Sequence, residues 1–173
     1  SIHAPEAYGL AGFEELFIRK DGRALQLWHH APAAGFPTIV YFHGNASHMG
    51  NRAGKYHAFA EAGFGVLALS YRGYGKSTGL PTEAGLYDDA RAALAYVSEN
   101  LNMPLSRVLV YGESLGSGVA VQMAVEHDIG ALVLEAAYLS VAQRASELYP
   151  YIPVKWLIKD GFHSIQKIAK VKA

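Results

Sequence analysis

Four short runs of the chain are almost wholly apolar, and polar or turn-forming residues separate them. Strands that are buried on both faces of a parallel sheet have this composition. Two further candidate strands, Glu14–Arg19 and Ala24–His30, flank Asp21-Gly22, a dipeptide that favours a two-residue hairpin turn. The pattern therefore predicts six strands. The first two form an antiparallel hairpin, and the last four are Thr38–Phe42, Gly65–Leu69, Arg107–Tyr111 and Ala131–Leu134.

Helical spacing of apolar residues fills the segments between these strands. From Thr82 to Leu101, apolar side chains recur every three or four residues and leave one polar face. A second helix is predicted for Arg52–Ala62, because the following Gly63 can adopt the left-handed conformation that ends a helix. A third, Leu115–Glu126, is apolar around its whole circumference, which predicts a helix packed against the sheet. This alternation predicts an α/β fold with a mostly parallel sheet and helices on both faces.

The composition of the chain excludes several classes of function. The 173 residues fit a single domain, 1–173, and the formal net charge of zero gives no electrostatic footprint for nucleic acid. No apolar run approaches the roughly 18 residues that would span a bilayer. With no cysteine, a disulfide framework, a thiolate zinc site and a cysteine nucleophile are excluded, and the eight histidines show no metal-ligand spacing. We therefore expect neither a metal nor a cofactor; the compartment stays open, with the cytoplasm favoured.

The strongest chemical signal is Gly112-Glu113-Ser114-Leu115-Gly116. It matches G-x-S-x-G and joins the strand RVLVY directly to the apolar helix. A chain that turns this sharply from strand to helix needs small residues on both sides of the turn, and Gly112 and Gly116 supply them. The turn would project the Ser114 hydroxyl from the carboxyl end of a central strand. Ser114 is therefore the candidate nucleophile for attack on a carbonyl carbon.

Two backbone N–H groups are candidates for an oxyanion hole, the pair of donors that stabilises the negative oxygen of a tetrahedral intermediate. The Leu115 N–H lies at a helix start, where it has no acceptor within the helix. The second candidate is the Asn45 N–H, because the small-residue turn that begins His43-Gly44-Asn45 follows a strand ending at the same sheet edge. In this scheme His43 and Gly44 support the loop and take no part in proton transfer.

The segments YFHGNASHMGNR, SYRGYGKSTG and YGESLGSG resemble the α/β-hydrolase superfamily, most closely the serine-hydrolase group of Bem46-like proteins and serine aminopeptidases. The resemblance runs from about Phe13 to the C-terminus. It implies an eight-stranded sheet and hydrolysis of an ester or amide through an acyl-enzyme. It also implies a triad completed by an Asp after strand seven and a His after strand eight. Ser114, Leu115 and Asn45 match the family's nucleophile and oxyanion donors, whereas Ser70 stands where the family usually has Asp.

The chain departs from that pattern towards its C-terminus. Six of the family's eight strands are predicted, and neither the acid nor the histidine expected downstream is present. We therefore expect 1–173 to be a truncated hydrolase domain that is inactive by itself. The strand Ala131–Leu134 would lack a neighbour, and such an apolar edge could pair with a second copy in a homo-oligomer. Segment 136–165 is expected to be part of a cap that suits a substrate with an apolar group, because it contains Tyr138, Tyr149, Tyr151 and Trp156.

Other hypotheses stay open. A hydrolase fold could serve as a binding or scaffold protein without catalysis. The glycines of YGESLGSG also resemble the dinucleotide-binding loop of an oxidoreductase, with Glu135 as a ribose ligand, but Glu113 would then place a carboxylate beside a pyrophosphate. His48 and the pair Asp160 and His163 are further candidates. The simpler interpretation is that His48 lies in a loop and faces solvent, and that Asp160 and His163 belong to a polar turn after the cap. Glu113 itself is expected to be exposed or paired.

Overall fold

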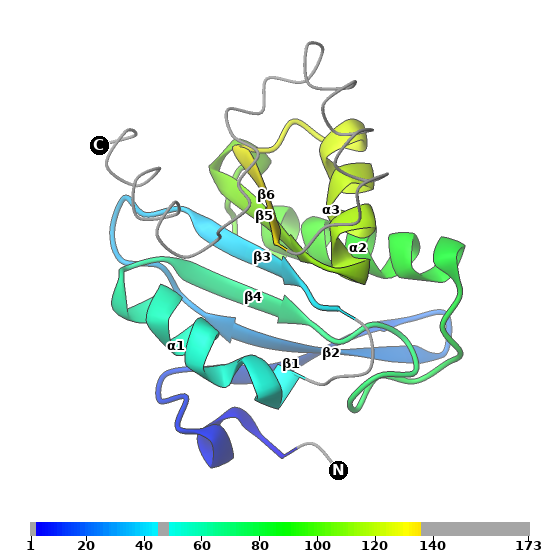
Figure 1. Cartoon of the computed structure of the whole chain (residues 1–173), viewed down its shortest axis with the longest axis horizontal. Coiled ribbons are helices and arrows are strands. Elements are labelled where there is room, and N and C mark those ends of the chain that lie inside the picture. The colour runs from blue at the N-terminus through cyan, green and yellow to red at the C-terminus, as the bar shows by residue number, and fades with distance from the viewer. Residues whose placement is uncertain (1–2, 45–48, 136–173) are drawn as a thin grey trace.

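The computed structural model describes residues 3–44 and 49–135, which form one sheet with helices on both of its faces (Figure 1). All six predicted strands are present in this part of the chain, so the predicted fold class is confirmed. Their order across the sheet is β1-β2-β4-β3-β5-β6. The cap expected at 136–165 lies outside the described residues. In chain order the strands are β1 (Glu14–Lys20), β2 (Arg23–His30), β3 (Thr38–Phe42), β4 (Gly65–Leu69), β5 (Val108–Glu113) and β6 (Ala131–Glu135).

The sheet is mixed, with the hairpin at one side and the parallel strands beside it. Strands β3, β4, β5 and β6 run parallel, whereas β2 runs antiparallel to both β1 and β4. In the β1–β2 turn, φ is 51° at Asp21 and 71° at Gly22, and Lys20 pairs with Arg23. Positive φ at both turn residues is typical of the type I′ turn, whose twist matches that of a hairpin. The two-residue turn and the antiparallel hairpin that Asp21-Gly22 predicted are therefore confirmed.

Three α-helices connect the described strands: α1 (Ala53–Glu61), α2 (Glu83–Asn100) and α3 (Leu115–Glu126). Three 3₁₀ turns accompany them: η1 (Pro5–Tyr8), η2 (Met49–Arg52) and η3 (Leu105–Arg107). Two predicted boundaries shift because of these turns, since Arg52 ends η2 and Arg107 ends η3. A third boundary shifts by one residue: Thr82, the first residue of the predicted helix Thr82–Leu101, is the N-cap of α2. Its Oγ1 accepts a hydrogen bond from the Gly85 N–H at 3.0 Å, which satisfies a donor that the helix leaves unpaired.

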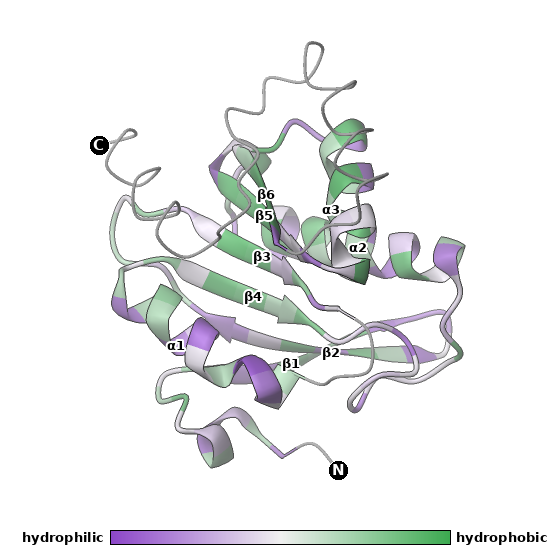
Figure 2. Cartoon of the chain, viewed as in Figure 1, coloured by the Kyte–Doolittle hydropathy of each residue, from purple (hydrophilic) through white to green (hydrophobic). Residues whose placement is uncertain are grey.

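Two apolar cores lie on opposite faces of the sheet. Helices α2 and α3 cover one face, where Val40 and Val110 are buried, and α1 covers the other, where Tyr41 and Tyr111 are buried. Figure 2 shows the hydrophobic colour along much of the central strands, whereas α1 and the hairpin carry both colours. The predicted packing of α3 against the sheet is confirmed by its contacts with β5 and β6, although Val125 is 46% exposed. Helix α3 packs on β5, β6 and α2, and this arrangement leaves an outer strip uncovered.

The carboxyl ends of the four parallel strands meet at one edge of the sheet. Strand β5 ends at Glu113, directly before Ser114, and its neighbour β6 ends at Glu135. On the other side of β5, strand β3 is followed by His43 and Gly44. In open α/β sheets, ligands bind at the carboxyl ends of the strands. The topology therefore places the sequence motifs at the edge where a site is expected.

Candidate active site

Ser114 joins β5 to α3 with an unusual backbone conformation. Its φ is 50° and its ψ is −113°, and it is partly buried. The Ser114 N–H donates to the Glu135 carbonyl oxygen at 2.9 Å, and the Ser114 carbonyl oxygen accepts from the Ser117 N–H at 2.9 Å. The Ser114 hydroxyl makes no capping hydrogen bond to α3. The backbone of this serine is thus held at both ends, whereas its side chain is not used in the helix cap.

Two glycines make this turn sterically possible. A Cβ on Gly112 would lie 2.5 Å from the Gly116 carbonyl oxygen and 2.7 Å from the Ala120 Cβ. A Cβ on Gly116 would lie 2.0 Å from the carbonyl oxygen of Phe42, at the end of β3. All three distances are far inside van der Waals contact, so any side chain would force the backbones apart. Gly112 allows the strand and helix to fold onto each other, and Gly116 lets α3 touch the neighbouring strand.

The turn after β3 lies against the elbow. A Cβ on Gly44 would lie 3.2 Å from the Ser114 Cβ and 3.3 Å from the Glu113 carbonyl oxygen, so the two backbones are in close contact. Asn45, the predicted second oxyanion donor, lies outside the described residues. Leu115 is the first residue of α3, and its N–H makes no hydrogen bond to a backbone carbonyl of the described residues.

His43 is fully buried beside this turn. Its Nδ1 lies 2.6 Å from the Gly44 carbonyl oxygen, and its own carbonyl oxygen accepts from the Tyr71 hydroxyl at 3.0 Å. Burial lowers the pKa of His43 to about 4, and the positive charge of Arg52 acts in the same direction. An imidazole with this pKa is neutral near pH 7 and is a weak base. These contacts suit the supporting role that the sequence suggested for His43.

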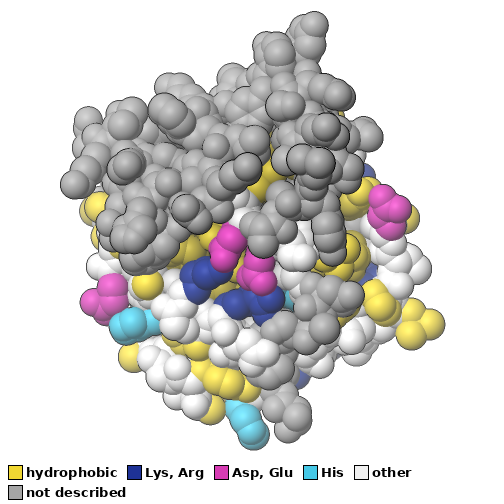
Figure 3. Space-filling view, viewed as in Figure 1, with side chains coloured by type: hydrophobic (Ala, Val, Ile, Leu, Met, Phe, Trp, Pro, Cys, Tyr) yellow, Lys and Arg dark blue, Asp and Glu magenta, His cyan; other side chains and the backbone are white. Residues whose placement is uncertain are grey.

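An ion-pair cluster that sequence reasoning missed lies beside the elbow. Glu113 accepts two hydrogen bonds from one guanidinium, from Arg52 Nε at 2.8 Å and from Arg52 Nη2 at 2.5 Å. The Tyr41 hydroxyl also donates to Glu113. Burial raises the pKa of Glu113, but the bonds from Arg52 and Tyr41 and the charge of Lys55 outweigh it and lower the pKa to about 2. Figure 3 shows acidic and basic side chains side by side near the middle of this face.

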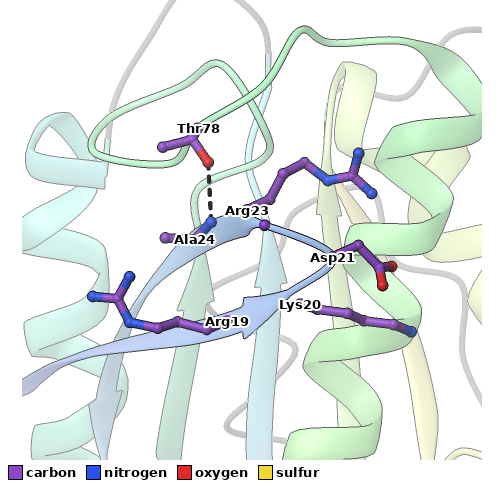
Figure 4. A pocket seen from close by; sticks show the side chains of 7 residues that line it. Arg19, Lys20, Asp21, Arg23, Ala24 and Thr78 are labelled. Atoms are coloured by element: carbon purple, nitrogen blue, oxygen red, sulfur yellow. Dashed lines mark hydrogen bonds between the residues drawn. The ribbon is translucent and has the colours of Figure 1, made fainter.

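Several other candidate residues cannot be placed relative to Ser114, because they are not among the residues that the structure describes. His48, Asp160 and His163 lie outside the described residues, as do the aromatic residues of the expected cap. Within residues 3–44 and 49–135, no cluster of three His, Asp or Glu could hold a metal, and no helix is long and apolar enough to cross a membrane. A hollow of about 360 Å³ lies at the β1–β2 turn, and its lining does not include Ser114. Figure 4 shows side chains that line it. The hollow is lined by Arg19, Lys20, Asp21, Gly22, Arg23, Ala24 and Thr78.

Comparison with known proteins places the chain in a family. A family model described as "Serine aminopeptidase, S33" matches residues 36–168. The chain belongs to this α/β-hydrolase family. An uncharacterised protein of Mycobacterium tuberculosis is 37% identical over 165 residues, which are 94% of this chain and 59% of that protein. Protein bem46 of Schizosaccharomyces pombe is 41% identical over 118 residues, which are 66% of this chain and 40% of that protein. The chain thus spans less than two thirds of the length of these two relatives.

Solved structures support the same fold. An α/β hydrolase from Vibrio vulnificus matches with a TM-score of 0.70 and 21% identity, over 95% of this chain and 57% of that chain. A protein described as a predicted CIB-like hydrolase from Thermoplasma acidophilum matches with a TM-score of 0.64 and 16% identity, over 90% of this chain and 95% of that chain. At these identities the likeness concerns the fold alone. The chemistry of this member of the serine aminopeptidase family is therefore inferred from its own residues.

Proposed function

We propose that the protein is a serine hydrolase that cleaves an ester or amide bond through an acyl-enzyme on Ser114. The observation that carries the proposal is the conformation of Ser114. It has a positive φ between a central strand and a buried helix, and its hydroxyl is not used in the helix cap. A side chain presented from a strained strand-to-helix turn is typical of the nucleophile of α/β hydrolases. Membership of a serine aminopeptidase family supports the same chemistry.

The proposed reaction has two steps. In the first, Ser114 Oγ forms a bond to the substrate carbonyl carbon while its proton passes to a general base. The tetrahedral intermediate then collapses, the bond to the leaving alcohol or amine breaks, and the leaving group takes up the proton. In the second, water loses a proton to the general base and bonds to the acyl carbon, the bond from that carbon to Ser114 Oγ breaks, Oγ takes up the proton, and the carboxylic acid leaves. We assign the Leu115 and Asn45 N–H groups as donors to the negative oxygen.

The general base is not assigned to His43. That imidazole is fully buried, is held at Nδ1 by the Gly44 carbonyl oxygen, and has a pKa of about 4. A base with so low a pKa would accept the serine proton only weakly near neutral pH. No described residue forms a hydrogen bond with Ser114 Oγ. We therefore assign the base and the acid that orients it to residues outside 3–44 and 49–135.

We further propose that the substrate carries an apolar acyl or alcohol group. Support for this comes from the sequence of 136–165, which contains Tyr138, Tyr149, Tyr151 and Trp156. Aromatic side chains offer large apolar surfaces to a ligand. A scaffold protein without catalysis is the competing function, and a dinucleotide-binding oxidoreductase is a more remote one. Neither of these alternatives accounts for a serine held at a strained turn.

Covalent labelling tests the proposal. The full-length protein encoded by the gene is treated with a fluorophosphonate, which reacts with activated serines, and the labelled peptide is identified by mass spectrometry. We expect label on Ser114, and turnover of p-nitrophenyl acetate that is lost in Ser114→Ala. Ser98→Ala, which changes an exposed serine on α2, is the control and should keep both. Absence of label at Ser114 together with a rise in melting temperature on adding NAD would favour the dinucleotide hypothesis.

A further inference from the structure

Two carboxylates flank Ser114, one before it in sequence and one on the neighbouring strand. Glu113 precedes Ser114 at the end of β5, and Glu135, its register partner at the end of β6, accepts the Ser114 N–H through its carbonyl oxygen. Each carboxylate is paired with a cation from the start of α1. Arg52 binds Glu113 with two hydrogen bonds, and Lys55 Nζ lies 2.6 Å from Glu135 Oε2. Helix α1 is therefore tied to the elbow at two points.

Aromatic side chains join the two ion pairs into one unit. Tyr41 donates to Glu113, and Tyr111 donates to Glu135. The two rings are stacked, with their centroids 4.7 Å apart, and Lys55 Nζ lies 5.6 Å from each centroid. Both rings project from the central strands β3 and β5 towards α1. We name these six residues the elbow clamp: Tyr41, Arg52, Lys55, Tyr111, Glu113 and Glu135.

The geometry points to a role for this clamp, which rests on the proposed function. We propose that Arg52, acting through Glu113, is a positioning residue that keeps Ser114 in its strained conformation at the sheet edge. A residue in a sparsely populated conformation persists only where its surroundings fix it on several sides. On one side of Ser114, α3 and the Glu135 carbonyl oxygen fix the backbone. On the other side, the guanidinium of Arg52 holds the side chain of the residue that precedes Ser114.

The chemistry of the pair suits positioning better than surface solvation. The side chains of Arg52 and Glu113 are only 11% and 18% exposed. A guanidinium that binds a carboxylate through two parallel N–H groups fixes direction as well as distance, which a lysine ammonium cannot do. Arg52 Nη1 is also buried and has no hydrogen-bond partner among the described residues, so the arginine keeps this geometry although one donor is left unsatisfied.

The decisive experiment removes the pair without leaving a buried charge. Removing one partner of a buried ion pair can unfold a protein, whereas replacing both by neutral groups is often tolerated. The full-length double variant Arg52→Met/Glu113→Gln is therefore compared with the parent on p-nitrophenyl acetate. We expect kcat to fall about 10- to 100-fold, the range that a misplacement near 1 Å produces, with KM changed by less than about threefold. The rate of fluorophosphonate labelling should fall by the same factor as kcat.

The chain offers a matched control. Arg91 binds Glu126 with the same two-bond geometry, through Nε at 2.8 Å and Nη2 at 2.5 Å, but this pair joins α2 to α3 on the surface. The variant Arg91→Met/Glu126→Gln should therefore leave kcat and KM unchanged. Conservative replacement of the clamp arginine gives a second readout. Arg52→Lys keeps the charge but loses the bidentate geometry, so its kcat should lie between those of the parent and the double variant.

The outcomes separate this inference from the proposed function. If the clamp double variant folds and keeps the parent kcat, or if the surface double variant loses as much kcat as the clamp variant, the positioning role is overturned. If every loss of kcat follows a loss of folded protein, as shown by melting temperature, the pair is merely structural and the inference also fails. Ser114→Ala is measured in parallel. If its turnover equals that of the parent, the proposed function itself is wrong, whatever the clamp variants show.

Discussion

Replacing Ser114 with glycine is expected to stabilise the protein although it removes the candidate nucleophile. A non-glycine residue in a sparsely populated region such as φ 50°, ψ −113° costs about 1–3 kcal/mol. Glycine has no Cβ, so this cost is removed. Glycine also loses more conformational freedom on folding, which lowers the gain in stability by about 0.5–1 kcal/mol. The Ser114 hydroxyl has no hydrogen-bond partner among the described residues, so its loss adds little. The net gain in the free energy of unfolding should be about 1 kcal/mol, which corresponds to about 2–4 °C in melting temperature for a domain of this size.

Ser114→Ala is the matched control, because alanine removes the same hydroxyl but keeps the Cβ and therefore the strain. Both variants of the full-length protein are unfolded with urea and followed by circular dichroism, so that the two unfolding free energies share one method. We expect Ser114→Gly to be more stable than Ser114→Ala by about 1 kcal/mol and both to be inactive. A glycine variant that is no more stable than the alanine variant would refute the argument that the elbow stores strain.

Two further predictions concern the packing and the charge of the elbow. Gly116→Ala should lower the free energy of unfolding by about 3 kcal/mol or more, because the new Cβ would lie 2.0 Å from the Phe42 carbonyl oxygen. Gly118→Ala in the same helix is the control. Its new Cβ would meet nothing within 4 Å, so this variant should not destabilise the protein. Urea unfolding of both variants checks this, and equal losses would contradict it. The pKa of Glu113 is lowered to about 2 from 4.5, so its contribution to stability is fully present above pH 4.5 and is lost as the pH falls towards 2. The parent should therefore be more stable than Glu113→Gln at pH 6, and this difference should shrink at pH 3. A difference that is the same at both pH values would show that the Glu113 charge does not stabilise the fold.

Much of the fold was predictable because it depends on local signals. Each central strand is a short apolar run, since it is covered by helices on both faces and has no polar side to reveal. The Asp-Gly turn specified the hairpin, and the paired glycines specified the strand-to-helix elbow. The boundaries were less predictable. Arg107 is a turn residue rather than part of β5, because its N–H donates to the Pro104 carbonyl oxygen at 2.9 Å and closes a 3₁₀ turn.

The elbow clamp could not be predicted in the same way. Arg52 and Glu113 are 61 residues apart in sequence, and a long-range ion pair leaves no periodic pattern. The sequence nevertheless indicated that Glu113 needs a partner. Side chains alternate along a strand, so Tyr111 and Glu113 on β5 must point to the same face. The aromatic ring at Tyr111 marks that face as buried, which makes an unpaired carboxylate at Glu113 unfavourable. Only the identity of its partner required the structure.

The backbone conformation favours the proposed site at Ser114 by a route that is independent of the sequence motif. Among the described residues, three non-glycine residues have positive φ: Asp21, Asn102 and Ser114. Asp and Asn tolerate this region because their short polar side chains form local hydrogen bonds, and both of these residues lie in connections between elements. Serine has no such preference, and no local hydrogen bond from its hydroxyl compensates Ser114. Where a local preference is broken without local compensation, the surrounding structure must impose the conformation, and such positions cluster at functional sites. The strain, the exclusion of any Cβ at Gly112 and Gly116, and the clamp from α1 therefore converge on one residue, which is the reason to test Ser114 before any other.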